Sequence, residues 1–135
     1  MNQVLVGKNV PRLEDPPLVT GKGRFVDDLN PPGLLHAAFV RSPFAHAKID
    51  GIDKSMALEM AGVHGVYALE DLKPHLTDTL IKTALPSPSF LESRHRPVLA
   101  DGEVVYVGEP VAVVIADSRH IAEDAAAQVM VDYDP

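Results

Sequence analysis

Cysteine is absent from the 135-residue chain, and its absence removes several kinds of chemistry. Disulfide bonds, thiolate metal sites, iron–sulfur clusters ligated by this chain and cysteine nucleophiles are all excluded. A cysteine-free chain also fits a reducing compartment, where disulfides would not persist. Candidate sites must therefore come from other residue types, with histidine, serine and the carboxylates first among them.

Basic residues and long apolar runs are also scarce. The 12 lysine and arginine residues are outnumbered by 19 aspartate and glutamate residues, which gives a net charge of −7. We therefore expect neither nucleic acid nor an anionic membrane as a partner. The longest apolar run, Val111–Ala116, is far short of the roughly 20 residues of a membrane-spanning helix. The N-terminus has no apolar stretch typical of a signal peptide, so the sequence predicts a cytoplasmic location.

Proline is present in excess, at 12 of 135 positions against an average of about 5%. Many of the prolines fall in two irregular stretches, an extended arm at about 8–24 and a loop at about 73–97. A chain of this length with 46% apolar residues can bury a core of its own. Residues 1–135 are therefore predicted to form a single domain. No helix is expected in the arm, because its prolines and glycines interrupt any helical period.

Apolar periodicity predicts an α+β domain with a mixed sheet and two main helices. Asp53 is expected to cap the first helix, and Asp117 or Ser118 the second. An Asp101-Gly102 turn is predicted to join two short strands as a hairpin. The predicted helices are 54–61 and 118 to about 127, and the predicted strands are 24–26, 34–41, 48–53, 63–69, 97–100, 103–107, 111–116 and 129–133, the last of them at a sheet edge.

The segment RSPFAHAKID places Ser42, His46 and Asp50 four residues apart, and these are the residue types of a hydrolase triad. A triad needs its base within hydrogen-bonding distance of the nucleophile, and this spacing would align the three side chains on a helix. Pro43 and the strand pattern that follows argue against a helix, and no G-x-S-x-G elbow surrounds Ser42. We therefore interpret the segment as a connection between two strands, with Ser42 closing a turn. A small serine hydrolase is the least favoured alternative.

Other patterns indicate binding or catalysis only weakly. The GKG at 21–23 lacks the third glycine of a dinucleotide fingerprint, so we expect a bend that leads into a strand. The six histidines form neither H-x-x-x-H nor H-E-x-x-H pairs. Adjacent carboxylates, as at 123–124, are explained by caps and solvated turns. We therefore expect no catalytic, cofactor-binding or metal-binding residue in this chain.

Three motifs follow one another along the chain: RSPxAHAxI at 41–49, VGxPVAxVxA at 107–116 and AEDAA at 122–126. In this order and spacing they resemble the start of the large, molybdopterin-binding subunit of the molybdenum hydroxylases. This is the family of xanthine dehydrogenase, aldehyde oxidase and aerobic carbon monoxide dehydrogenase. The resemblance runs from about 6 to 135, and only 73–96 lack a recognisable pattern. The DD after RFV and the PPG before LLHAA are most similar to the bacterial carbon monoxide dehydrogenase branch.

The resemblance implies an a/b hammerhead domain, with an α+β fold and a protruding β-hammerhead. It also implies that the full enzyme oxidises or hydroxylates a small substrate, with water as the oxygen source. Molybdopterin, or molybdopterin cytosine dinucleotide, with molybdenum would be bound by the much larger portion that follows. Iron–sulfur clusters and FAD would belong to other subunits or domains. None of the family's catalytic residues has a counterpart here, so the isolated chain is predicted to be inactive.

The resemblance further implies a structural or interface role within a longer subunit, of which this chain is expected to be a fragment. The implied partners are the rest of that subunit, the iron–sulfur and flavin subunits or domains and, through bare apolar patches, a second copy of the chain. Arg12 and Arg41 are the candidate interface residues, because each lies in an extended or turning segment flanked by proline. The alternative is an independent binding or scaffold module with the hammerhead fold.

Overall fold

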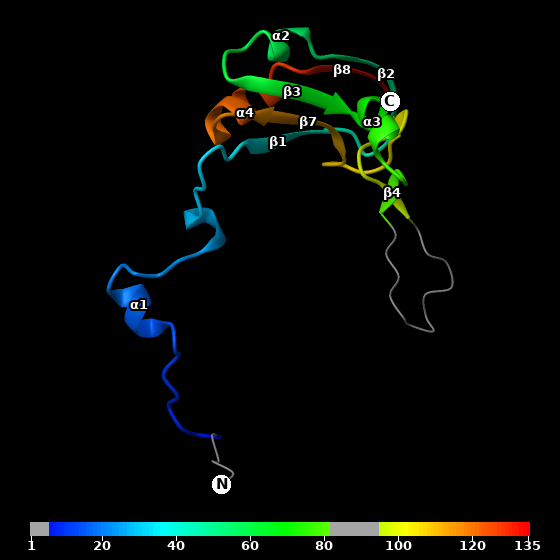
Figure 1. The fold of residues 1–135 in the computed structure, drawn as a ribbon. Helices are drawn as coiled ribbons and strands as arrows, with labels where there is room; N and C mark the ends of the chain where they lie inside the picture. Colours follow the sequence, from blue (N-terminus) through cyan, green and yellow to red (C-terminus); the bar gives the residue numbers. More distant parts are fainter. Residues whose placement is uncertain (1–5, 82–94) are drawn as a thin grey trace. The chain divides into compact units, whose positions relative to one another are not determined.

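A computed structural model describes residues 6–81 and 95–135 (Figure 1). The chain divides into two units, Met1–Leu34 and Leu35–Pro135, each with its own architecture. Most of the irregular loop predicted at 73–97 lies outside the described residues. In the part of the chain that is described, no helix has both the length and the apolar character needed to cross a bilayer.

The first sheet of the larger unit has the strand order β1-β7-β3. Its strands are β1 (His36–Arg41), β7 (Pro110–Ala116) and β3 (Val63–Ala68), and both pairs are antiparallel. β7 contains the longest apolar run of the chain, as expected for a strand buried between two neighbours. Val114, at its middle, is fully buried.

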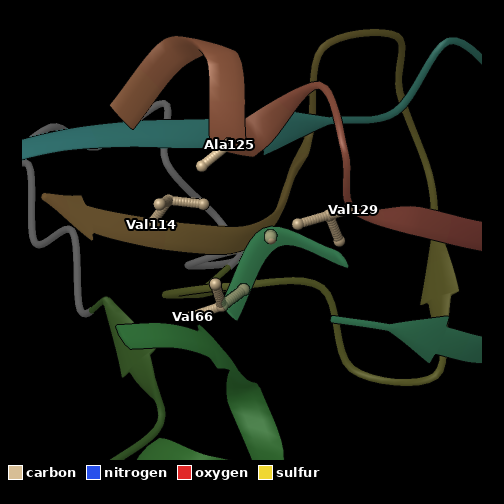
Figure 2. Packing of buried hydrophobic residues seen from close by; sticks show 5 residues of the cluster. Val66, Val114, Ala125 and Val129 are labelled. Atoms are coloured by element: carbon tan, nitrogen blue, oxygen red, sulfur yellow. The ribbon is translucent and has the colours of Figure 1, made fainter. Parts of the chain in front are cut away.

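Helix α4 (Arg119–Ala126) packs on one face of the first sheet. Ser118 caps it, because its Oγ accepts a hydrogen bond from the Ile121 amide at 3.3 Å. Figure 2 shows Ala125 of α4 beside Val114 of β7, with Val66 of β3 and Val129 in the same apolar cluster, which also contains Ala57. This cluster is the main core of the unit, and it lies on the α4 side of the sheet.

The second sheet has the order β6-β2-β8, again with antiparallel pairs. Its strands are β6 (Glu103–Val104), β2 (Ala47–Asp53) and β8 (Met130–Asp134). A second apolar cluster supports it, formed by Ala47, Ala100, Val104 and Val111. β8 lies at the edge of this sheet, as its alternating pattern predicted.

Shorter elements complete the larger unit. Strands β4 (Leu80–Ile81) and β5 (Arg96–Pro97) pair with each other. The helical turns are α2 (Ser55–Leu58), α3 (Leu69–Leu72) and the 3-10 turn η2 (Lys73–His75). The α+β class is therefore confirmed, but every strand pair among the described residues is antiparallel, which corrects the expected mixed sheet.

Two predictions of local structure in this unit need correction. The helix predicted at 54–61 is only the turn α2, although the Asp53 carboxylate does accept a hydrogen bond from the Ser55 amide at 2.9 Å. The hairpin at Asp101-Gly102 is wrong, because β5 pairs with β4 and β6 pairs with β2. Local turns end α2 early, since the Met60 amide bonds to the Ala57 carbonyl and the Val63 amide to the Met60 carbonyl. The hairpin fails because β5 and β6 pair with strands elsewhere in the sequence, which a local pattern does not reveal.

The smaller unit contains α1 (Asp15–Val19) and the 3-10 turn η1 (Val26–Asp28). The prediction that proline forbids a helix here is wrong. Pro16 and Pro17 fall in the first turn of α1, where a helix requires no amide donor. The strand predicted at 24–26 is also wrong, because this segment leads into η1. None of the described residues of this unit is buried.

Candidate functional site

The structure assigns Ser42 to a turn. Its side chain is 3% exposed, and its Oγ accepts a hydrogen bond from the Phe44 amide and donates one to the Phe44 carbonyl, each at 3.0 Å. The Ser42 amide also donates to the Glu109 carbonyl at 2.9 Å, and its carbonyl accepts from Gly108 at 2.8 Å. The interpretation of Ser42 as the residue that closes the strand connection is confirmed.

The other two members of the apparent triad have different surroundings. His46 lies with its Nε2 3.3 Å from Oε2 of Glu103, in a pair that is well exposed. Asp50 lies on β2 with an exposed side chain. Because Ser42 is buried against Phe44 while His46 is directed to Glu103, the structure does not bring these side chains together as a nucleophile and its base.

Glu109 is a buried charged residue that the sequence did not identify. Its side chain is 4% exposed, and its Oε2 accepts a hydrogen bond from the Val105 amide at 2.6 Å. Together with the backbone bonds between Ser42 and the 108–109 segment, this contact fastens the β6–β7 connection to the end of β1. The only sequence signal was the G-E-P string at 108–110, which reads as an ordinary solvated turn.

A group of charged side chains surrounds a pocket of about 400 Å³ in the larger unit. Lys54 Nζ lies 2.8 Å from Oδ2 of Asp71, and Lys73 bridges Glu70 and Asp101. The hydrogen bond from Lys54 is the main cause that lowers the pKa of Asp71, and the Ala68 amide contributes as well. The charges are thus largely compensated within the group, which favours a structural role over ligand binding.

The histidines give no metal centre in the part of the chain that is described. His64 pairs with Asp117, with 2.7 Å between Nε2 and Oδ1, and this pair is exposed. Among residues 6–81 and 95–135, no three histidine, aspartate or glutamate side chains lie together as a metal site would require.

The two candidate interface arginines both have intramolecular partners. Arg12 Nε lies 2.8 Å from Oδ1 of Asp15, in front of α1, with a side chain that is 74% exposed. Arg41 ends β1, and its Nη1 donates to the Gly108 carbonyl at 2.9 Å. Its guanidinium also lies 5.4 Å from the ring centroid of Phe39. Their role in an interface remains a prediction.

Exposed apolar side chains are the most prominent surface feature of the smaller unit. Leu13 and Val6 are 97% and 90% exposed. Within this unit Leu18 packs closely on Gly23, where a Cβ atom would lie 2.7 Å from Leu18 Cδ2. The further exposed apolar residues of the unit are Val10, Val19, Phe25, Val26, Leu29 and Leu34.

The sequence profile of the aldehyde oxidase and xanthine dehydrogenase a/b hammerhead domain matches residues 20–135. The chain belongs to this hammerhead family. The fold class and the family that the motifs indicated are both confirmed. Domains of this kind occur in the molybdenum hydroxylase enzymes.

Two relatives of this hammerhead domain are the large subunits of a hydroxylase and of a dehydrogenase. The chain is 48% identical to the nicotine 6-hydroxylase large subunit of Paenarthrobacter nicotinovorans over 121 residues, 90% of this chain and 14% of that protein. It is 44% identical to the carbon monoxide dehydrogenase large chain of Hydrogenophaga pseudoflava, over 90% of this chain and 14% of that protein. The chain thus spans about one-seventh of the length of these two relatives.

A solved structure has the same fold. Quinoline 2-oxidoreductase from Pseudomonas putida 86 superposes with a TM-score of 0.84 and 41% identity, covering 98% of this chain and 16% of that one. The family implies molybdenum in the full enzyme, but the described residues of this hammerhead domain do not assemble a ligand set for a metal ion.

Proposed function

We propose that the hammerhead domain is a non-catalytic structural part of the large, molybdenum-binding subunit of a molybdenum hydroxylase. The observation that carries the proposal is the pair of coverages: 90% of this chain aligns with only 14% of the nicotine hydroxylase large subunit. A segment that forms one-seventh of a subunit and whose charged groups pair with one another is suited to bracing the remainder.

The complete enzyme, in this proposal, oxidises or hydroxylates a small substrate with water as the oxygen source. Molybdopterin, with or without a cytosine nucleotide, is held by the remainder of the subunit, and iron–sulfur clusters and FAD are held by partner subunits or domains. The absence of cysteine supports a cytoplasmic enzyme in which this domain carries no cluster of its own.

The smaller unit supports a role in assembly. Its described residues bury no side chain, yet they include apolar side chains such as Leu13, Val19 and Phe25 that are more than half exposed. An apolar segment of this kind gains stability when another surface covers it. We propose that the arm and its Arg12 contact other parts of the enzyme.

The test is made in the complete enzyme. The gene is extended past codon 135, and the large subunit is purified with and without residues 1–135 alongside its partner subunits. Metal analysis should give a molybdenum content near one per intact subunit and a clear loss after the deletion. Restoring residues 1–135 as a separate polypeptide should restore the metal. A truncated subunit that keeps its full molybdenum content and its partners would contradict the bracing role and favour an independent module.

A further inference from the structure

The first sheet has one face covered by α4 and one that is not. Val66 and Val114 point into the core beneath α4. Because side chains alternate along a strand, the residues on either side of Val66 in β3 and of Val114 in β7 point to the opposite face. The register places Phe39, Val113 and Tyr67 in one row across the three strands. The outer face consists of Ala37, Phe39, Gly65, Tyr67, Val113 and Ile115.

This outer face is apolar and partly open. Phe39 is 47% exposed and Tyr67 is 39% exposed, while Val113 and Ile115 are half-buried. Gly65 is buried because the Tyr67 ring lies over it, in the space that a Cβ atom would need. The Tyr67 ring therefore lies along β3 over Gly65, so that no side chain projects from this part of the face.

Charge is confined to the border of the outer face. None of its six members is ionisable at neutral pH. Arg41, at the end of β1, stacks beside Phe39 and already donates to the Gly108 carbonyl. A surface with an apolar centre and a polar border is typical of permanent interfaces, whose centres resemble a protein core.

We propose that the outer face is the docking surface for the remainder of the same large subunit, the portion that follows residue 135. This inference rests on the proposed function and identifies the surface through which it acts. Each relative carries roughly six-sevenths of its length outside the hammerhead domain, so ample chain is available to cover the face. A second copy is a poorer occupant, because each copy would bring a net charge of −7.

The test uses the complete large subunit in its assembled enzyme. Phe39 is replaced by the photoreactive amino acid p-benzoylphenylalanine, which preserves its ring, and crosslinked peptides are identified by mass spectrometry. Met130 on β8, which is 58% exposed and lies outside the outer face, carries the same substitution as a matched control. We expect crosslinks from position 39 to residues beyond 135 of the same chain.

A second measurement does not depend on crosslinking chemistry. In the assembled enzyme Phe39→Cys should react with a thiol reagent at least about tenfold more slowly than Met130→Cys, although the two native side chains have similar exposure in this domain. Each rate is referred to the urea-unfolded subunit, which corrects for local differences in thiol reactivity.

Other outcomes would overturn the inference. Equal thiol reactivity at positions 39 and 130 would show that the outer face is no better covered than the control. Crosslinks from position 39 to another copy, to residues 1–135 or to a partner subunit would name a different occupant. The metal test of the deleted subunit is independent of these results, so the bracing role can hold even if this surface is the wrong one.

Discussion

At the scale of single residues, Ser42 and Glu109 stabilise a strand connection. Ser42 Oγ makes two hydrogen bonds with the Phe44 backbone, and Glu109 Oε2 binds the Val105 amide. The turn at Ser42 could be predicted from the sequence because Pro43 restricts the local backbone. The contact of Glu109 could not, because nothing in the G-E-P string indicates that the side chain turns inward to an amide.

Ser42→Ala should lower the free energy of unfolding by about 1–3 kcal/mol, because it removes a buried hydroxyl that satisfies two backbone groups. Urea denaturation followed by circular dichroism measures the change. Asp50→Ala, at the exposed position of the apparent triad, is the control and should stay within about 0.5 kcal/mol. Unchanged stability of Ser42→Ala would contradict the structural role of this hydroxyl.

Asp71 gives a prediction about pH. Its pKa is lowered by the hydrogen bond from Lys54, with help from the Ala68 amide. A carboxyl group whose pKa is lowered by folding stabilises the protein above its unfolded pKa, and this contribution is lost as the pH falls through the folded value. Asp71→Asn should therefore cost on the order of 1 kcal/mol at pH 7, because the ion pair is partly exposed.

The same variant should lose its disadvantage in acid. Urea denaturation of the native protein and of Asp71→Asn should give stabilities that converge as the pH falls below about 4. Lys54→Met should bring the pKa of Asp71, followed by NMR, back toward its ordinary value. A stability difference that stayed constant from pH 7 to pH 3 would show that the charge of Asp71 is unimportant.

At the scale of elements, β7 and α4 could be predicted because each has a sustained pattern of its own. The strands that pair with β5 and with β6 could not be predicted. The Asp101-Gly102 turn is a strong local hairpin signal, but β6 finds its partner in β2, more than fifty positions earlier. The short helix α1 has a different explanation. Proline in the sequence argues against a helix, but proline is compatible with the first turn of one, where α1 places it.

Gly62 allows the chain to turn from α2 into β3. It has a φ of +85°, and a Cβ atom there would lie 3.0 Å from Ile121 Cδ1 of α4. Gly62→Ala should lower the free energy of unfolding by about 1–2 kcal/mol, because alanine is strained at this φ. Gly51→Ala on β2 is the matched control, since its Cβ would meet only Asp132 at 3.6 Å. Equal effects of the two substitutions in a urea titration would refute this explanation.

At the scale of the whole molecule, the family could be recognised from three sequence motifs. The outer face, which we propose as the docking surface, could not be predicted from the sequence. Arg12 and Arg41 are predicted interface residues because proline lies near each in the sequence, and in the structure each also has a partner within the chain. The outer face depends on strand order, which places Phe39 and Tyr67 on either side of Val113. Phe39 and Tyr67 are 28 positions apart in the sequence, and Val113 follows Tyr67 by 46 positions, so their common surface emerges only in the fold.

In the proposed assembly, this domain stabilises the rest of a molybdenum-binding subunit through its outer face. The most direct measurement is the affinity between residues 1–135 and the remainder of the subunit, expressed as two polypeptides. We predict a one-to-one complex that Phe39→Glu weakens by about tenfold or more, as expected for a buried aromatic contact, while Met130→Glu leaves it unchanged. No association between the two polypeptides, or equal effects of the two substitutions, would contradict the account.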